Sequence, residues 1–132
     1  MPDFAAFFPS TEATQPPTSF SAVERIFRGP MRADDVRIEK VRMNGFVGTH
    51  LDQVLRTQGI GTLYFTGVNI DQCVATTMEE ACFRDYNCVL LEDACATSSP
   101  DYCRESVVFN AKQCWGFSTT TAKFAAAREL ER

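Results

Sequence analysis

Residues 62–82 limit the possible fold more than any other stretch, because they read as a strand, a turn and a helix in direct succession. Residues 62–68 are rich in β-branched and aromatic side chains and are bounded by glycines, which is typical of a buried, central parallel strand. From Asp71 onward the apolar residues recur at helical spacing. The apolar positions of this predicted helix are Val74, Met78, Ala81 and Cys82.

Cys73 lies in the first turn of the same predicted helix. A thiol at that position faces unpaired backbone N–H groups and the positive end of the helix dipole, which both stabilise the thiolate. A cysteine in an apolar context is more commonly a small core residue. The local pattern therefore leaves two interpretations, an activated nucleophile and a packing residue.

Further elements surround this unit. Alternation of apolar and charged residues predicts a strand over residues 35–41, with Lys40 in phase with its apolar positions. The later elements are a helix after Thr49 that ends at Gly59, a strand over 87–94, a helix from Ser98 to Gly116, an edge strand over 117–119, and a last helix that is capped by Thr120 or Thr121 and reaches Leu130. Strands that alternate with helices predict an α/β fold, a three-layer α/β/α Rossmann-like parallel sheet flanked by helices.

Ligands of such sheets bind outside the carboxyl ends of the strands, where Lys40, residues 67–73 and residues 92–95 all fall. A lysine there commonly extends its ammonium group to the rim, so strand phase alone does not make Lys40 catalytic. Glu92 and Asp93 are neighbours on a strand and point to opposite faces, which makes them poor acid and base partners. Capping of a nearby loop is the simpler interpretation.

The length and composition of the chain limit the classes of protein to which it can belong. A chain of 132 residues is the size of one domain, and the prolines of residues 1–31 favour an irregular segment before a domain over 32–132. The net charge of -4 leaves no basic stripe for nucleic acid, and no apolar run approaches the ~20 residues that span a membrane. The apolar run Phe4 to Phe8 is too short for a secretory signal, which indicates a cytoplasmic location. Six cysteines without a C-x-x-C pair indicate no disulfide framework.

Three sequence signatures occur in order: KVRMNGF from Lys40 to Phe46, GVNIDQCV ending at Val74, and EDA from Glu92 to Ala94. With them the chain from about Asp35 resembles the isochorismatase-like cysteine hydrolases. Within that family it looks most similar to the ureidoacrylate-type amidohydrolases, on the segments NGF, LDQVLRTQGI, FTG and LEDA.

The resemblance implies a six-stranded parallel sheet and a Cys, Lys and Asp triad that hydrolyses small amide, ureido or carbamoyl C–N bonds without a cofactor. It assigns Cys73 as the nucleophile and Lys40 as the cation that supports its thiolate. It also implies a cis peptide between Val68 and Asn69, with the N–H groups of Asn69 and Cys73 as the oxyanion hole. Phe46 either lines the substrate pocket or covers the core. No metal site is expected, since His50 is the only histidine, and the expected partners are a small-molecule substrate and further copies of the chain.

One departure from the family concerns the triad's acid, which follows an N-terminal strand in the family and has no equivalent here. In the family, two strands also lie between the lysine-bearing and the cysteine-bearing strands. Three interpretations remain: residues 35–41 pair directly with 62–68, residues 4–27 supply strands, or the chain is a truncated part of a longer hydrolase, which we favour. A catalytically impaired relative with a binding or oligomerisation role is the alternative function.

Overall fold

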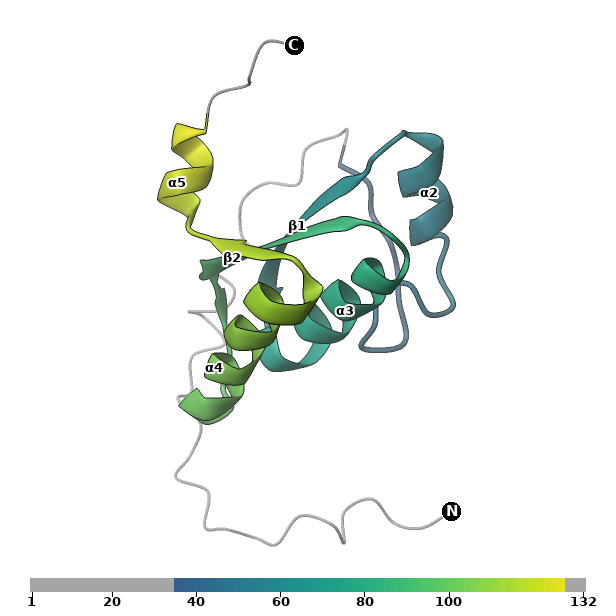
Figure 1. Cartoon of the computed structure of the whole chain (residues 1–132). Helices are drawn as coiled ribbons and strands as arrows, with labels where there is room; N and C mark the ends of the chain where they lie inside the picture. The colour runs from purple at the N-terminus through teal and green to yellow at the C-terminus, as the bar shows by residue number, and fades with distance from the viewer. Residues whose placement is uncertain (1–34, 128–132) are drawn as a thin grey trace, which may run out of the picture. The chain divides into compact units, whose positions relative to one another are not determined.

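A computed structural model describes residues 35–127 of the chain (Figure 1). Its strands are β1 (Thr62–Val68), β2 (Asn87–Ala96) and β3 (Phe117–Thr119). Its helices are α2 (Leu51–Thr57), α3 (Ala75–Phe83), α4 (Asp101–Asn110) and α5 (Thr121–Ala126), with π-helical turns η2 (Ile70–Val74) and η3 (Ala111–Trp115). The expectations for residues 1–31, for the domain boundary at residue 32 and for the end of the last helix at Leu130 lie outside the described residues.

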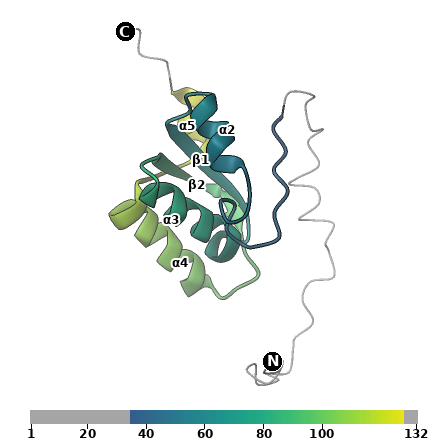
Figure 2. The same cartoon turned by 90° about the vertical axis from the view of Figure 1, so that its right-hand side faces the viewer.

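The sheet has the order β1-β2-β3, and both ladders are parallel. Leu63 and Phe65 of β1 pair with Cys88 and Leu90 of β2, so these four side chains share one face. That face packs against the core residues of α3 and α4, and Figures 1 and 2 show these two helices side by side. The parallel α/β fold predicted from the sequence is therefore confirmed.

The opposite face of the sheet contacts α5. Tyr64 points away from Leu63 and Phe65, and its ring centroid lies 4.7 Å from that of Phe124 on α5. Thr120 caps this short helix, because its hydroxyl oxygen accepts a hydrogen bond from Lys123 N at 3.3 Å. Helices thus contact both faces of the sheet.

The core lies between the sheet and the helices α3 and α4. Its largest fully buried side chains are Ile70, Met78, Cys88 and Leu90. Val74, Met78 and Ala81 are all buried at the helical spacing that the sequence predicted. The period of the sequence therefore located this face of α3 correctly.

β1 differs from its predicted environment. The bounds Thr62–Val68 agree with the prediction, but within the described residues β1 forms a ladder with β2 alone, and β2 is the middle strand. Thr62, Tyr64 and Thr66 are exposed. A run of β-branched and aromatic residues predicts a strand, but it does not specify how many neighbours the strand has.

Residues 35–41 do not form a strand, which corrects the sequence prediction. Among them only Ile38 is partly buried, and Val36 and Val41 are exposed. Val36 and Ile38 alternate with charged residues, so this segment has too little apolar surface to pack on the sheet. Direct pairing of residues 35–41 with β1 is therefore absent from the structure.

Candidate active site

Cys73 lies in the turn η2, which follows β1 after one intervening residue, Asn69. The carbonyl oxygen of Asn69 accepts hydrogen bonds from Gln72 N at 3.2 Å and Val74 N at 3.3 Å. The Cys73 thiol donates to Val68 O at 3.2 Å and is partly exposed. The thiol therefore lies at the carboxyl end of a parallel strand, where ligands of such sheets bind.

The backbone before this turn has a distinct geometry. The peptide bond between Val68 and Asn69 is cis. The Asn69 side chain donates from Nδ2 to Gln72 Oε1 at 3.2 Å, which links the first residue after β1 to the turn. The assignment of Asn69 and Cys73 N–H groups to an oxyanion hole stays a prediction.

Asp71 is a residue of this turn that the sequence patterns did not single out. Thr97, just after β2, donates from Oγ1 to Asp71 Oδ1 at 2.5 Å, and Ser99 provides a further hydrogen bond. Burial raises the pKa of Asp71, but the hydrogen bonds from Thr97 and Ser99 outweigh it, so the pKa lies below its ordinary value of 3.8. The sequence contained a signal for this link: a carboxylate stands two residues before Cys73, and residues with hydroxyl groups follow the next strand.

Replacing Thr97 with valine should lower the free energy of unfolding at neutral pH by about 1 kcal/mol, because the partly exposed Asp71 carboxylate loses a hydroxyl donor. The lowered pKa of Asp71 contributes stability at pH values above the pKa that this carboxyl has in the unfolded chain. This contribution disappears as the pH falls through the pKa that it has in the folded protein. Urea unfolding between pH 7 and pH 3 should therefore show that acidification lowers the free energy of unfolding less for Thr97→Val than for wild type. Thr97→Ser keeps the hydroxyl and should follow wild type. An equal decrease in the free energy of unfolding in all three proteins would contradict the link.

Lys40 lies away from the position that the sequence predicted. Its ammonium group is exposed and donates to Arg42 O at 2.9 Å. Between residues 35 and 127 the structure has no hydrogen bond between Lys40 and Cys73. The expected placement depended on a strand that ends at Lys40, and residues 35–41 do not form that strand. The catalytic role of Lys40 stays a prediction.

Phe46 is a core residue in the structure. Only 5% of it is exposed, and its ring stacks on Tyr86 with centroids 6.0 Å apart. The Arg84 guanidinium lies over the same ring, 5.2 Å from its centroid. Of the two interpretations that the sequence left open, this position agrees with the covering of the core.

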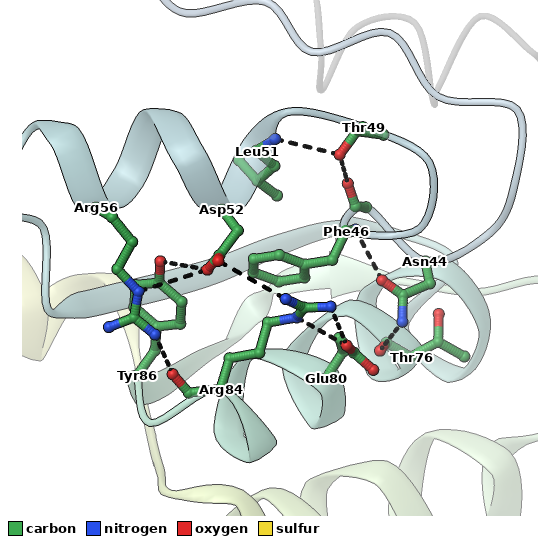
Figure 3. A network of polar contacts seen from close by, with 11 residues as sticks. Asn44, Phe46, Thr49, Leu51, Asp52, Arg56, Thr76, Glu80, Arg84 and Tyr86 are labelled. Atoms are coloured by element: carbon green, nitrogen blue, oxygen red, sulfur yellow. Dashed lines mark hydrogen bonds and ion pairs between the residues drawn. The ribbon is translucent and has the colours of Figure 1, made fainter.

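A network of polar contacts surrounds Phe46 and joins α2 to α3 and to the residues between α3 and β2 (Figure 3). Tyr86 donates from its hydroxyl to Asp52 at 2.8 Å, and Arg84 bonds Glu80 at 2.7 Å and lies 3.7 Å from Asp52. Burial raises the pKa of Tyr86, and the hydrogen bond to Asp52 raises it further. Arg56 contacts the ring of Tyr86 at 4.3 Å. These partners satisfy one another, which indicates a structural role.

Glu92 and Asp93, both on β2, bond residues of β3 and α5. Glu92 accepts a hydrogen bond from Ser118 at 2.9 Å, which is the main cause of its lowered pKa. Asp93 accepts from the backbone N–H of Thr121 at 2.8 Å and from its hydroxyl at 2.7 Å. Because Thr121 is the first residue of α5, Asp93 caps that helix. Asp93 therefore agrees with a capping role, at the start of α5, whereas Glu92 bonds a residue of the strand β3.

No three His, Cys, Asp or Glu side chains among residues 35–127 lie close enough together to hold a metal ion. No helix in the same range is both long and apolar enough to cross a membrane.

Comparison with known proteins decides the family. Residues 6–123 match the isochorismatase domain. The chain is a member of the isochorismatase family. It is 38% identical over 90 residues to the ureidoacrylate amidohydrolase RutB of Caulobacter vibrioides, a match that covers 68% of this chain and 40% of the relative. The RutB protein of an Enterobacter species is 37% identical over 93 residues, which cover 70% of this chain and 40% of that protein.

Solved structures give the same family. A cysteine hydrolase from Pseudomonas syringae superposes with a TM-score of 0.68 and 28% identity, over 73% of this chain and 50% of that protein. N-carbamoylsarcosine amidase from Thermoplasma acidophilum superposes with a TM-score of 0.61 and 29% identity, over 77% of this chain and 54% of the amidase. This isochorismatase-family chain spans about 40% of the length of the curated relatives that it matches.

Proposed function

We propose that this chain is an amidohydrolase domain that cleaves small amide, ureido or carbamoyl C–N bonds with Cys73 as the nucleophile. The observation that carries the proposal is the position of the Cys73 thiol, partly exposed at the carboxyl end of β1 in a turn between a strand and a helix. The similarity to ureidoacrylate amidohydrolases and to an N-carbamoylsarcosine amidase supports the substrate class.

In the proposed reaction the Cys73 thiolate attacks the substrate carbonyl carbon and forms a tetrahedral intermediate. The C–N bond then breaks, ammonia or an amine leaves with the proton that the Cys73 thiol gave up on forming the thiolate, and a thioester to Cys73 remains. Water attacks the thioester, releases the acid product and restores the thiol. Lys40 would stabilise the thiolate, which requires its ammonium group to leave its contact with Arg42 O.

Alkylation with iodoacetamide followed by mass spectrometry tests the nucleophile. Cys73 should be labelled at neutral pH faster than Cys114, although Cys114 is the more exposed thiol, because a thiolate reacts with iodoacetamide and a neutral thiol does so only slowly. Lys40→Ala should slow the labelling of Cys73 and leave that of Cys114 unchanged. Labelling of Cys73 no faster than that of Cys114 would end the nucleophile proposal.

Hydrolysis of ureidoacrylate, nicotinamide and isochorismate analogues by the same samples tests turnover. Cys73→Ser should abolish any hydrolysis, and Cys114→Ser, a change at an exposed thiol, should not. A folded protein with a fast-labelling Cys73 and no hydrolysis would favour the alternative, a catalytically impaired relative with a binding role. One observation favours that alternative: within residues 35–127 the hydrogen-bond acceptors of the Cys73 thiol are the carbonyl oxygens of Val68 and Asn69, and no carboxylate of this range is among them.

Self-association is part of the same proposal. Within residues 35–127, β1 pairs with β2 alone and its Tyr64 is 50% exposed, and an open strand edge favours pairing with another chain. Light scattering of the samples used for hydrolysis should give a mass above that of one chain. A single-chain mass at high concentration would contradict it.

A further inference from the structure

Thr77, on α3, makes two hydrogen bonds with its single hydroxyl group. It donates to Cys73 O at 2.6 Å and accepts from Gly45 N at 2.9 Å. A hydroxyl can donate one hydrogen bond and accept others, so both contacts form at once. Thr77 thus connects the backbone of the cysteine-bearing turn to a loop 32 residues away in the sequence.

The loop that contains Gly45 has a second link to the same helix. Asn44 donates from Nδ2 to Thr76 O at 3.2 Å, and its Oδ1 accepts from Phe46 N at 2.8 Å (Figure 3). Phe46 in turn is buried in the core. The loop over residues 44–46 is therefore anchored both in the core and on α3.

The packing around Thr77 is tight. A Cβ atom on Gly45 would lie 3.1 Å from Cγ2 of Thr77, tighter than ordinary contact. Thr76, the neighbouring threonine, bonds Gln72 O at 3.0 Å and Cys73 O at 3.4 Å, and in the described part of the chain its hydroxyl reaches no residue of the loop. Thr77 is therefore the threonine whose hydroxyl joins the turn to the loop.

We propose that Thr77 is a positioning residue for the reaction at Cys73, and this inference rests on the proposed function. Its hydroxyl fixes the carbonyl group of Cys73, which sets the peptide plane next to the Cα from which the thiol extends. The same hydroxyl holds the loop that follows Lys40 against the turn. Loss of the hydroxyl leaves Cys73 O and Gly45 N without this partner, so the turn and the loop can shift relative to each other.

Thr77→Val replaces the hydroxyl with a methyl group of similar size. We expect it to slow iodoacetamide labelling of Cys73 and to lower kcat on the order of tenfold, with a smaller change in KM, because small misplacements of a reacting group act mainly on the rate. Thr77→Ser keeps the hydroxyl and should restore both rates to near those of wild type. Thr57→Val is the matched control and should leave both rates close to wild type, because it removes the same kind of hydroxyl bond, from Thr57 to Gln53 O at 2.7 Å, within α2.

The outcomes separate this inference from the function on which it rests. Slow labelling of Cys73 in wild type overturns both. Fast labelling in wild type and equally fast labelling in a folded Thr77→Val variant overturns the positioning role alone. If Thr77→Val does not fold, Thr77→Ala removes the hydroxyl without placing a methyl group against Cys73 O, and the same labelling comparison decides.

Discussion

Replacing Gly116 with alanine should lower the free energy of unfolding by several kcal/mol. Gly116 follows η3 with a φ of 150°, in the region that favours glycine. A Cβ atom there would lie 2.2 Å from Cys88 O and 3.1 Å from Cys88 C, which are backbone atoms of the middle strand. Backbone strain and overpacking each cost about 1–3 kcal/mol, against a total stability of about 5–15 kcal/mol.

Urea unfolding followed by the fluorescence of Trp115, the only tryptophan, measures this loss next to the substituted position. Gly48→Ala is the matched control, since Gly48 also has a positive φ, of 70°, but nothing lies within 4 Å of its added Cβ. The control should lose only the conformational part, about 1 kcal/mol. Equal losses in the two variants would show that contact with Cys88 has no role.

Local sequence pattern was sufficient to predict the strand and the turn that carry Cys73. β1 has its predicted bounds, and Cys73 lies in the turn that follows it, although this turn is π-helical and α3 begins at Ala75. Such features depend on residues that are near in sequence, such as the change from period two to a helical period. The same holds for the cap of α5 by Thr120, which accepts a hydrogen bond from Lys123 three residues later.

The sequence pattern did not predict the contacts between segments that are distant in the sequence. Thr77 meets Gly45 across 32 residues, and Thr97 meets Asp71 across 26. The spacing of the apolar residues shows which side of a helix is buried, but it does not show which polar groups contact each other once the elements pack. The polar links that hold the Cys73 turn therefore appear only in the structure.

The error over residues 35–41 has a related cause. Alternation shows that a segment is compatible with a strand, whereas a strand also needs a neighbour to complete its backbone hydrogen bonds. Within the described residues β1 pairs with β2 alone, and residues 35–41 form no strand. Lys40 is accordingly exposed, and its expected approach to Cys73 would need a different arrangement of this segment.

Phe46→Ala should lower the free energy of unfolding by about 3–5 kcal/mol, the usual cost of removing a buried aromatic side chain. Phe46 is only 5% exposed, and its loss removes the stacking with Tyr86 and the surface under Arg84. Phe46→Leu keeps an apolar side chain in the site and should cost less than alanine does. Urea unfolding of wild type, Phe46→Ala and Phe46→Leu under one condition measures these differences in the free energy of unfolding.

Phe83→Ala is the control for Phe46→Ala, because it is the same substitution at a residue that is 76% exposed on α3. It should change the stability by less than about 0.5 kcal/mol. The comparison also separates the two interpretations of Phe46. A residue that only lined a substrate pocket would leave the stability near wild type when truncated and would raise KM. A large loss of stability confined to Phe46→Ala instead assigns the ring to the core, where it supports the loop that Thr77 and Asn44 fasten to α3.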